Sequence, residues 1–275
     1  MIGSRSVHLT GSDLSDTIID AAWDAGLGVH AMILVSCFTI HQPCFISDAR
    51  FTYILPTRQF DDISDTTTWN NRRDQLLGTL LTNPKAKFVT RAVQFGSGTV
   101  YAPDSATPNL LADQINLAKK NLTSLGIPAT VSDRVSHYQS NGGTQSVLDA
   151  IDFVDLIMLP YYDPGASVPF KSWPDIWSDL QWMASKANGK KIILSMNGWP
   201  QVIPGPTGLS SNAVASLEHM VDYFNLLEFV CSELKTIAGG GVAWFAHAYS
   251  VEQDPVYGFL KNGQPQFKFG PLTSC

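Results

Sequence analysis

The chain has 275 residues, of which 44% are apolar and 15% charged, and its formal net charge is −6. Neutralising phosphates requires a basic face, so this charge argues against nucleic-acid binding. The length and apolar content fit one large α/β domain with a sizeable core, and we expect residues 1–275 to form that domain as a monomer.

Strand-like and helix-like patterns alternate along the chain. Strand-like runs occupy residues 6–9, 28–33, 88–95, 129–132, 153–159, 191–195 and 242–246. Helical patterns lie at about 15–25, 68–81, 110–125, 144–151, 173–187 and 213–237. Gly26 is placed to end the first helix, and Gly126, followed by Pro128, to end another. Strands separated by helices predict parallel βαβ units.

Residues 34–59 fit no element, because they show neither helical periodicity nor strict alternation and contain two prolines. A long insertion without structure is uncommon inside a compact domain. We therefore interpret this segment either as a genuine loop or as a gene-model error such as a translated intron, and we expect it to be poorly packed.

The ends of the chain and its cysteines bear on where the protein works. Residues 1–10 lack the apolar stretch of a signal peptide, so we expect a cytoplasmic protein or a natural start upstream. No apolar run reaches about 18 residues, which predicts no membrane-spanning helix. The four cysteines show no C-x-x-C spacing, so zinc or redox sites are disfavoured. A disulfide between the last helix and the tail fits a secreted protein, and reduced thiols are the alternative.

Several short segments in a fixed order carry a family resemblance. They are 6–10, 83–89, 93–97, 158–162, 197–200 and 244–247, and they lie mostly at the ends of the expected strands. In this order they resemble glycoside hydrolase family 17, the β-1,3-glucanases, in a fungal branch associated with the cell wall. The resemblance implies a (β/α)8 TIM-like barrel, a secreted or cell-wall location and β-glucan as the partner.

The resemblance aligns residues 6–9 with the second strand of the barrel, so the first strand is absent from the chain as written. Seven strands can be counted where the barrel needs eight. An open doubly wound sheet is the alternative fold. The run Gly239-Gly240-Gly241 precedes a strand and does not open a helix, so it gives that alternative no phosphate-binding loop.

Neither catalytic position of the family carries a carboxylate here. The resemblance places the acid/base glutamate at Gly98 and the nucleophilic glutamate at Met196. Retaining hydrolysis needs two carboxyl groups roughly 5 Å apart, and neither glycine nor methionine can ionise. We therefore expect a catalytically inactive barrel.

Other carboxylates near the strand ends are the fallback. The chain has four glutamates, of which Glu218, Glu228 and Glu233 fall in the helical pattern 213–237. Glu252 alone follows a strand, so it is the fallback catalytic residue. Asp104, Asp133 and Asp163 also lie near strand ends, although each is equally well explained as a turn or cap residue.

Aromatic residues cluster at the same strand ends. We expect Trp199, Tyr161, Tyr162 and Tyr249, together with Asn197, to bind substrate, because aromatic faces bury the apolar C–H surface of a sugar ring. Packing in the core is the alternative for each, and it is the favoured one for Trp244. His247 has no neighbouring His or Cys at ligand spacing, so we expect no metal and no cofactor.

These observations support three hypotheses about function. The first is a glucanase-like barrel of cell-wall carbohydrate metabolism that is catalytically inactive and at most binds glucan. The second is an active O-glycosyl hydrolase or transglycosylase on β-1,3-glucan that uses Glu252 or an aspartate. The third is a damaged gene product, suggested by the missing first strand and residues 34–59.

Overall fold

The computed structural model describes residues 6–8, 16–33, 66–100, 106–140, 144–204 and 212–268. Two compact units divide these residues, and we call them the amino-terminal unit, which ends at Asp155, and the carboxyl-terminal unit, which begins at Leu156. Strand β5 (Val154–Met158) carries the chain from one unit to the next. The anomalous segment 34–59 and Asp104 lie outside the described residues.

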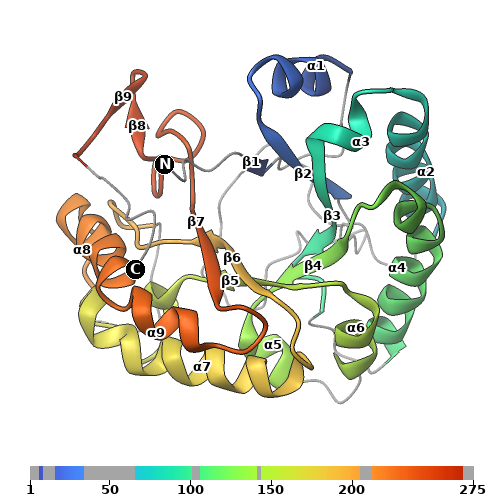
Figure 1. Ribbon diagram of the computed structural model, residues 1–275. Coiled ribbons are helices and arrows are strands. Elements are labelled where there is room, and N and C mark those ends of the chain that lie inside the picture. Colours follow the sequence, from blue (N-terminus) through green and yellow to red (C-terminus); the bar gives the residue numbers. More distant parts are fainter. Residues whose placement is uncertain are drawn as a thin grey trace, which may run out of the picture. The chain divides into compact units, whose positions relative to one another are not determined.

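The amino-terminal unit is a parallel sheet with helices between its strands (Figure 1). Its strands β1 to β4 are neighbours in chain order and all pair in parallel. They are β1 (Ser6–His8), β2 (Gly28–Ile33), β3 (Thr90–Ser97) and β4 (Ala129–Asp133). The helices are α1 (Asp16–Asp24), α2 (Thr66–Thr82), α3 (Ala86–Val89), α4 (Ala106–Leu125), α5 (Val135–Ser140) and α6 (Thr144–Ala150).

Two helices of this unit end in the same hydrogen-bonded turn, as their glycines predict. After α1, the N–H of Gly26 donates to the carbonyl of Trp23 and the N–H of Leu27 to that of Ala22. After α4, Gly126 and Ile127 make the equivalent pair of bonds. This is the Schellman motif, and it needs a left-handed residue, which Gly26 (φ 65°) and Gly126 (φ 69°) provide.

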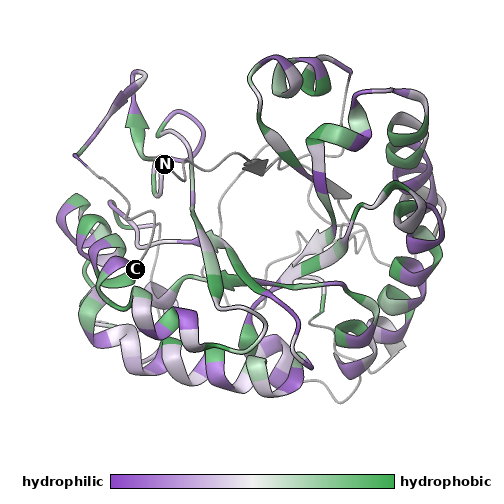
Figure 2. Ribbon diagram, viewed as in Figure 1, coloured by the Kyte–Doolittle hydropathy of each residue, from purple (hydrophilic) through white to green (hydrophobic). Residues whose placement is uncertain are grey.

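The core of the amino-terminal unit lies between the sheet and its helices. Helices α2 and α4 contact one another and also contact β2 and β4, respectively. Residues that this packing removes from water include Ile19, Leu80, Phe95, Leu111, Ile115 and Leu122. Burying each such side chain contributes about 1.5–3 kcal/mol. Figure 2 shows the matching pattern, since each long helix carries both hydrophobic and hydrophilic residues.

The carboxyl-terminal unit continues the alternation of strands and helices. Its sheet contains β5, β6 (Ile192–Asn197) and β7 (Val242–Ala246) in that order, and β6 pairs with β7 in parallel. The other elements are the 3₁₀ turns η1 (Pro160–Tyr162) and η2 (Pro169–Ser172), the helices α7 (Trp173–Lys186), α8 (Leu217–Phe229) and α9 (Cys231–Thr236), and the short strands β8 (Leu260–Lys261) and β9 (Gln264–Pro265).

Two sequence-based boundaries are wrong, and one hairpin was not predicted. The expected helix 213–237 is two helices, because Val230 leaves the helical conformation (φ −91°, ψ 11°) between α8 and α9. The expected strand 88–95 begins two residues later, because residues up to Val89 form α3. The β8–β9 hairpin was not expected, although Asn262 and Gly263 at its turn both have positive φ and form a known two-residue hairpin signal.

The order of elements is that of a (β/α) barrel. Seven strands of one sheet alternate with helices over the described residues, and β1 to β4 and β6 with β7 pair in parallel, which confirms the prediction of parallel βαβ units. The complete eight-stranded barrel stays a prediction. Cys231 is disulfide-bonded, whereas the other three cysteines lie outside the described ranges. Of the helices that the structure describes, none has the length and apolar character needed to cross a membrane.

Candidate functional site

Gly98 lies at the carboxyl end of β3, where barrel enzymes carry their active sites. Its N–H donates to the carbonyl of Ser132 in β4 over 2.8 Å, which fixes the loop that leaves β3. A Cβ added to Gly98 would meet no described atom within 4 Å, so there is open space at this position. Its backbone is left-handed (φ 71°), however, so a side chain here would be strained.

A buried carboxylate stands next to Gly98. Asp133, the last residue of β4, is fully buried and accepts hydrogen bonds from the N–H groups of Val100 (2.6 Å) and Arg134 (2.7 Å). The same carboxylate lies 2.5 Å from Nδ1 of His137 in α5. Asp133 therefore ties the loop after β3 to the end of β4 and orients an imidazole there.

His137 was not among the residues predicted from the sequence. The signal for it is an Asp and a His four residues apart where a strand ends and a helix begins. That spacing places both side chains on the same side of the first helical turn. The sequence spacing alone does not show what the pair does. The structure shows it, because the other oxygen of Asp133 accepts the N–H of Val100 and so holds the loop after β3.

Met196 lies at the carboxyl end of β6 in the other unit and is half-buried. The next residue, Asn197, is fully buried, and its Oδ1 accepts a hydrogen bond from the hydroxyl of Tyr223 over 2.6 Å. Burial raises the pKa of Tyr223 well above its usual value, so this hydroxyl keeps its proton and donates. Nδ2 of Asn197 has no partner among the described residues. A buried amide donor beside Met196 is thus available to an acceptor.

The expected stacking residues differ in how far a ligand can reach them. Trp199 is fully buried, and its Nε1 donates to the carbonyl of Val214 over 2.9 Å. Tyr161 packs edge-on against it at 5.4 Å, and Tyr162 is also buried, with its hydroxyl 3.1 Å from that of Tyr257. A sugar ring can reach the face of Trp199 only if a neighbour moves.

Tyr249 behaves differently, because 73% of its surface is exposed. It lies after β7, in the same loop as His247. Nε2 of His247 is 3.4 Å from Oδ2 of Asp254, whose other oxygen accepts the N–H groups of Val256 and Tyr257. Burial raises the pKa of Asp254, but the hydrogen bonds from His247 and the backbone outweigh it and hold that pKa below the usual value.

Glu252, the fallback catalytic residue, is an exposed side chain in the loop after β7. Its Oε1 accepts the N–H of Asn262 over 2.8 Å. This backbone hydrogen bond lowers the pKa of Glu252. A general acid for glycoside hydrolysis needs a raised pKa, so Glu252 is poorly suited to that role. Asp163 follows η1, where its N–H donates to the carbonyl of Pro160.

The remaining glutamates belong to helices. Glu218 lies in the first turn of α8, Glu228 in its last turn and Glu233 in α9. These are helix-surface positions, as the sequence indicates. Within the described ranges, no three His, Cys, Asp or Glu side chains are grouped so that they could hold a metal ion.

Comparison with solved structures identifies the fold. A β-1,3-glucanosyltransferase of glycoside hydrolase family 17 from Rhizomucor miehei matches with a TM-score of 0.62, 17% identity, and 94% of this chain and 85% of that chain covered. An active-site mutant of the Rhizomucor miehei β-1,3-glucanosyltransferase in complex with laminaritriose gives a TM-score of 0.65, 16% identity and coverage of 98% and 87%.

A second glycosidase family has a similar structure. A mutant endo-β-1,3-glucanase of glycoside hydrolase family 128 from Amycolatopsis mediterranei, in complex with laminaripentaose, matches with a TM-score of 0.54, 15% identity and coverage of 96% and 87%. No protein-family model and no curated protein matches the sequence. The chain has a fold like that of glycoside hydrolase family 17, and this confirms the resemblance at the level of fold.

Proposed function

We propose that the protein binds β-1,3-glucan at the carboxyl ends of its strands and does not cleave it by the two-glutamate mechanism of family 17. One observation carries this proposal: the positions that the resemblance assigns to the acid/base and the nucleophile are Gly98 and Met196. The structure describes both at strand ends. The similar proteins of known structure include glucanosyltransferases and glucanases in complex with laminari-oligosaccharides.

The inactivity follows from the chemistry of the two side chains. A positioned acid or base contributes about 10²–10⁴-fold in rate, and the covalent route also needs a nucleophile. Asp133 and Glu252 are poorly suited to replace them, because Asp133 is already engaged by three donors and the pKa of Glu252 is lowered. We therefore expect no release of reducing ends from laminarin above a buffer blank.

For glucan binding, the structure favours Tyr249 as the first contact. It is the described aromatic at a strand end whose ring is open to solvent. We also assign the buried residues Asn197, Trp199, Tyr161 and Tyr162 to the glucan site, where Nδ2 of Asn197 would donate to a sugar hydroxyl once the neighbouring side chains open. Affinity is weak, because a polyhydroxylated ligand exchanges hydrogen bonds with water for similar ones with protein. From the resemblance to family 17, we propose a location outside the cell or in the cell wall.

Calorimetric titration of the folded protein with laminari-oligosaccharides tests this proposal. We expect binding at millimolar ligand, and the variant Tyr249→Ala to weaken it about fivefold, the size of one aromatic contact. Phe229→Ala is the matched control, since Phe229 is an aromatic side chain, 79% exposed, at the end of α8. Absence of any heat from folded protein leaves a vestigial barrel as the explanation. Reducing-end release that Glu252→Gln abolishes favours an active hydrolase or transglycosylase instead.

A further inference from the structure

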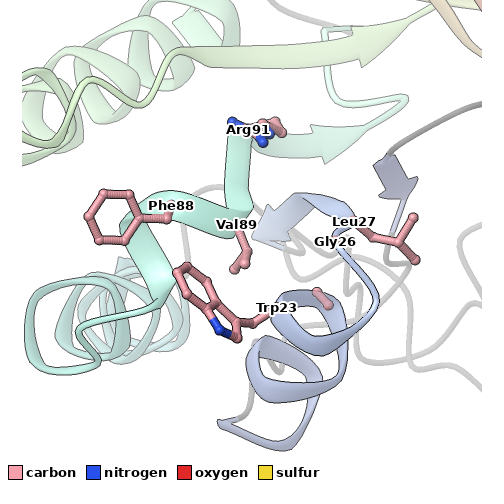
Figure 3. Close-up of a pocket in the computed structure, with 7 residues that line it drawn as sticks. Trp23, Gly26, Leu27, Phe88, Val89 and Arg91 are labelled. Carbon is pink, nitrogen blue, oxygen red and sulfur yellow. The ribbon is translucent and has the colours of Figure 1, made fainter. Parts of the chain in front are cut away.

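A pocket of about 210 Å³ opens at the end of the amino-terminal unit where β2 and β3 begin. It is lined by Ala22, Trp23, Gly26, Leu27, Phe88, Val89 and Arg91. In Figure 3 the rings of Trp23 and Phe88 lie next to each other, Val89 points toward the indole, and Arg91 extends from β3. Arg91 and Gly98 are seven residues apart on one strand, about 23 Å, so this Trp23 pocket is separate from the candidate site.

The floor of the pocket is a rigid part of the backbone. The turn that ends α1 supplies Ala22, Gly26 and Leu27, and two hydrogen bonds hold it. Helix α3 supplies its last residue, Val89, which is buried and lines the pocket together with Ala22. Helices α1 and α3, which supply Ala22 and Val89, contact one another. The pocket is therefore preformed, and little conformational entropy is lost when a ligand binds.

The sides of the pocket are exposed aromatic rings. Trp23 is 47% exposed and Phe88 55% exposed, and their centroids are 6.1 Å apart at an angle of 59°. Both rings remain exposed, although Ile19, which lies in α1 with Trp23, is fully buried. Two tilted aromatic faces at this spacing form an open corner that suits a flat or chair-shaped ring with an apolar face.

The polar side-chain groups of the pocket are hydrogen-bond donors, and one of them, the Arg91 guanidinium, is positively charged. The Arg91 guanidinium is exposed and makes no ion pair with any residue that the structure describes, and the Trp23 indole N–H donates to none of them. Lys87 adds a second cation, its Nζ 4.9 Å from the ring of Phe88. Of the described residues that line the pocket, none is acidic, and the nearby Asp20 is already paired with Lys85 over 2.6 Å.

We propose that the Trp23 pocket binds a single six-membered ring that carries one carboxylate, such as a hexuronate or an aromatic acid. The ring packs against Trp23 and Phe88, and the carboxylate accepts hydrogen bonds from Arg91, whose planar fork matches a carboxylate. The pocket, at about 210 Å³, is smaller than the roughly 300–1,000 Å³ of sites for larger organic ligands, so its size suits one ring. The proposed ligand of the Trp23 pocket is therefore negatively charged, whereas the β-1,3-glucan proposed for the strand ends is neutral.

Ligand-observed NMR and calorimetry on the whole protein test the proposal with four probes. Glucuronate and benzoate carry both a ring and a charge, glucose has only the ring, and acetate has only the charge. We expect at least one of the two ring acids to bind at millimolar concentration, and about tenfold more tightly than glucose or acetate. Binding of glucuronate alone identifies an acidic sugar, and binding of benzoate alone identifies an aromatic acid. Equal binding of glucose, or no binding of either ring acid, overturns the proposal.

Three variants locate the ligand. Arg91→Gln should weaken binding about fivefold, as expected for an exposed ion pair, and added salt should weaken binding to the unaltered protein in the same direction. Trp23→Ala should remove it. Lys120→Gln on α4 is the control for the loss of one positive charge, and Tyr249→Ala is the control for the glucan site. If Arg91→Gln and Trp23→Ala both bind as the unaltered protein does, the ligand is elsewhere and the assignment is wrong.

Discussion

At the scale of single residues, two carboxylates show how the same group acquires different properties. Asp133 has no exposed surface, and its two oxygens accept hydrogen bonds from the N–H groups of Val100 and Arg134 and contact Nδ1 of His137. Asp179 in α7 accepts no such hydrogen bond from the residues that the structure describes, and burial, with a smaller contribution from Asp175, raises its pKa to about 6. The hydrogen bonds of Asp133 stabilise the folded state, whereas Asp179 destabilises the folded state once it is ionised.

Replacing Asp133 by Ala should destabilise the protein by about 2–4 kcal/mol, because it leaves buried N–H donors without an acceptor. Asp133→Asn should cost less, since its amide oxygen can still accept from Val100 or Arg134. Chemical denaturation of both variants measures the difference. Equal stability of Asp133→Ala and the unaltered protein would show that these hydrogen bonds do not hold the loop after β3.

Asp179 predicts a dependence of stability on pH. Its folded pKa, about 6, lies above the unfolded value of 3.8, so its protonated form stabilises the fold below pH 4 and this stability is lost as the pH rises to about 6. Asp179→Asn should therefore be more stable than the unaltered protein at pH 7.5 by no more than about 1 kcal/mol, since water screens the half-exposed group. The gain should shrink at pH 4.5. Thermal denaturation at the two values checks this, and a gain that grows toward pH 4.5 would contradict it.

At the scale of elements, the sequence predicts best what depends on short-range chemistry. The strands 28–33 and 242–246 have the predicted bounds, and both glycine-terminated helices end where the glycines indicate. The break at Val230 could not be read, because no glycine or proline marks it. The burial of Trp199 under Tyr161 and Val214 also depends on residues distant in the sequence. The sequence therefore located the strand-end residues but not which of them a ligand can touch.

The end of β3 offers a test with two glycines of like conformation, because Gly96 lies within the strand and Gly98 directly follows it. Gly96 (φ 77°) and Gly98 (φ 71°) are both left-handed, but a Cβ at Gly96 would lie 2.5 Å from Cγ2 of Thr99, and one at Gly98 would meet no described atom within 4 Å. Gly98→Ala should cost about 1–2 kcal/mol from backbone strain alone. Gly96→Ala should cost more, because Thr99 must also move. Denaturant titration that ranks the two in the opposite order would contradict this account of the loop.

At the scale of the whole molecule, Gly98 and Met196, the positions where the resemblance to family 17 places the two catalytic glutamates, belong to different units of the chain. Gly98 follows β3 in the amino-terminal unit, and Met196 lies in β6 of the carboxyl-terminal unit. Catalysis by the family mechanism needs carboxyl groups at these positions to stand roughly 5 Å apart. Restoring both is thus a chemical measurement of whether the strand ends of the two units meet as they do in a glucanase.

The double variant Gly98→Glu with Met196→Glu should release reducing ends from laminarin, and each single variant should not, because the acid and the nucleophile act as one unit whose effects are not additive. We expect activity well below that of an intact glucanase, since the left-handed backbone at Gly98 strains a glutamate. Thermal denaturation must first show that all three variants are folded, and Gly98→Gln with Met196→Gln is the uncharged control. A single variant as active as the double would show that these positions are not the catalytic pair. A folded but inactive double variant would show that restoring the two carboxylates is not enough. Either the strand ends of the two units do not meet as catalysis requires, or another part of the groove is damaged.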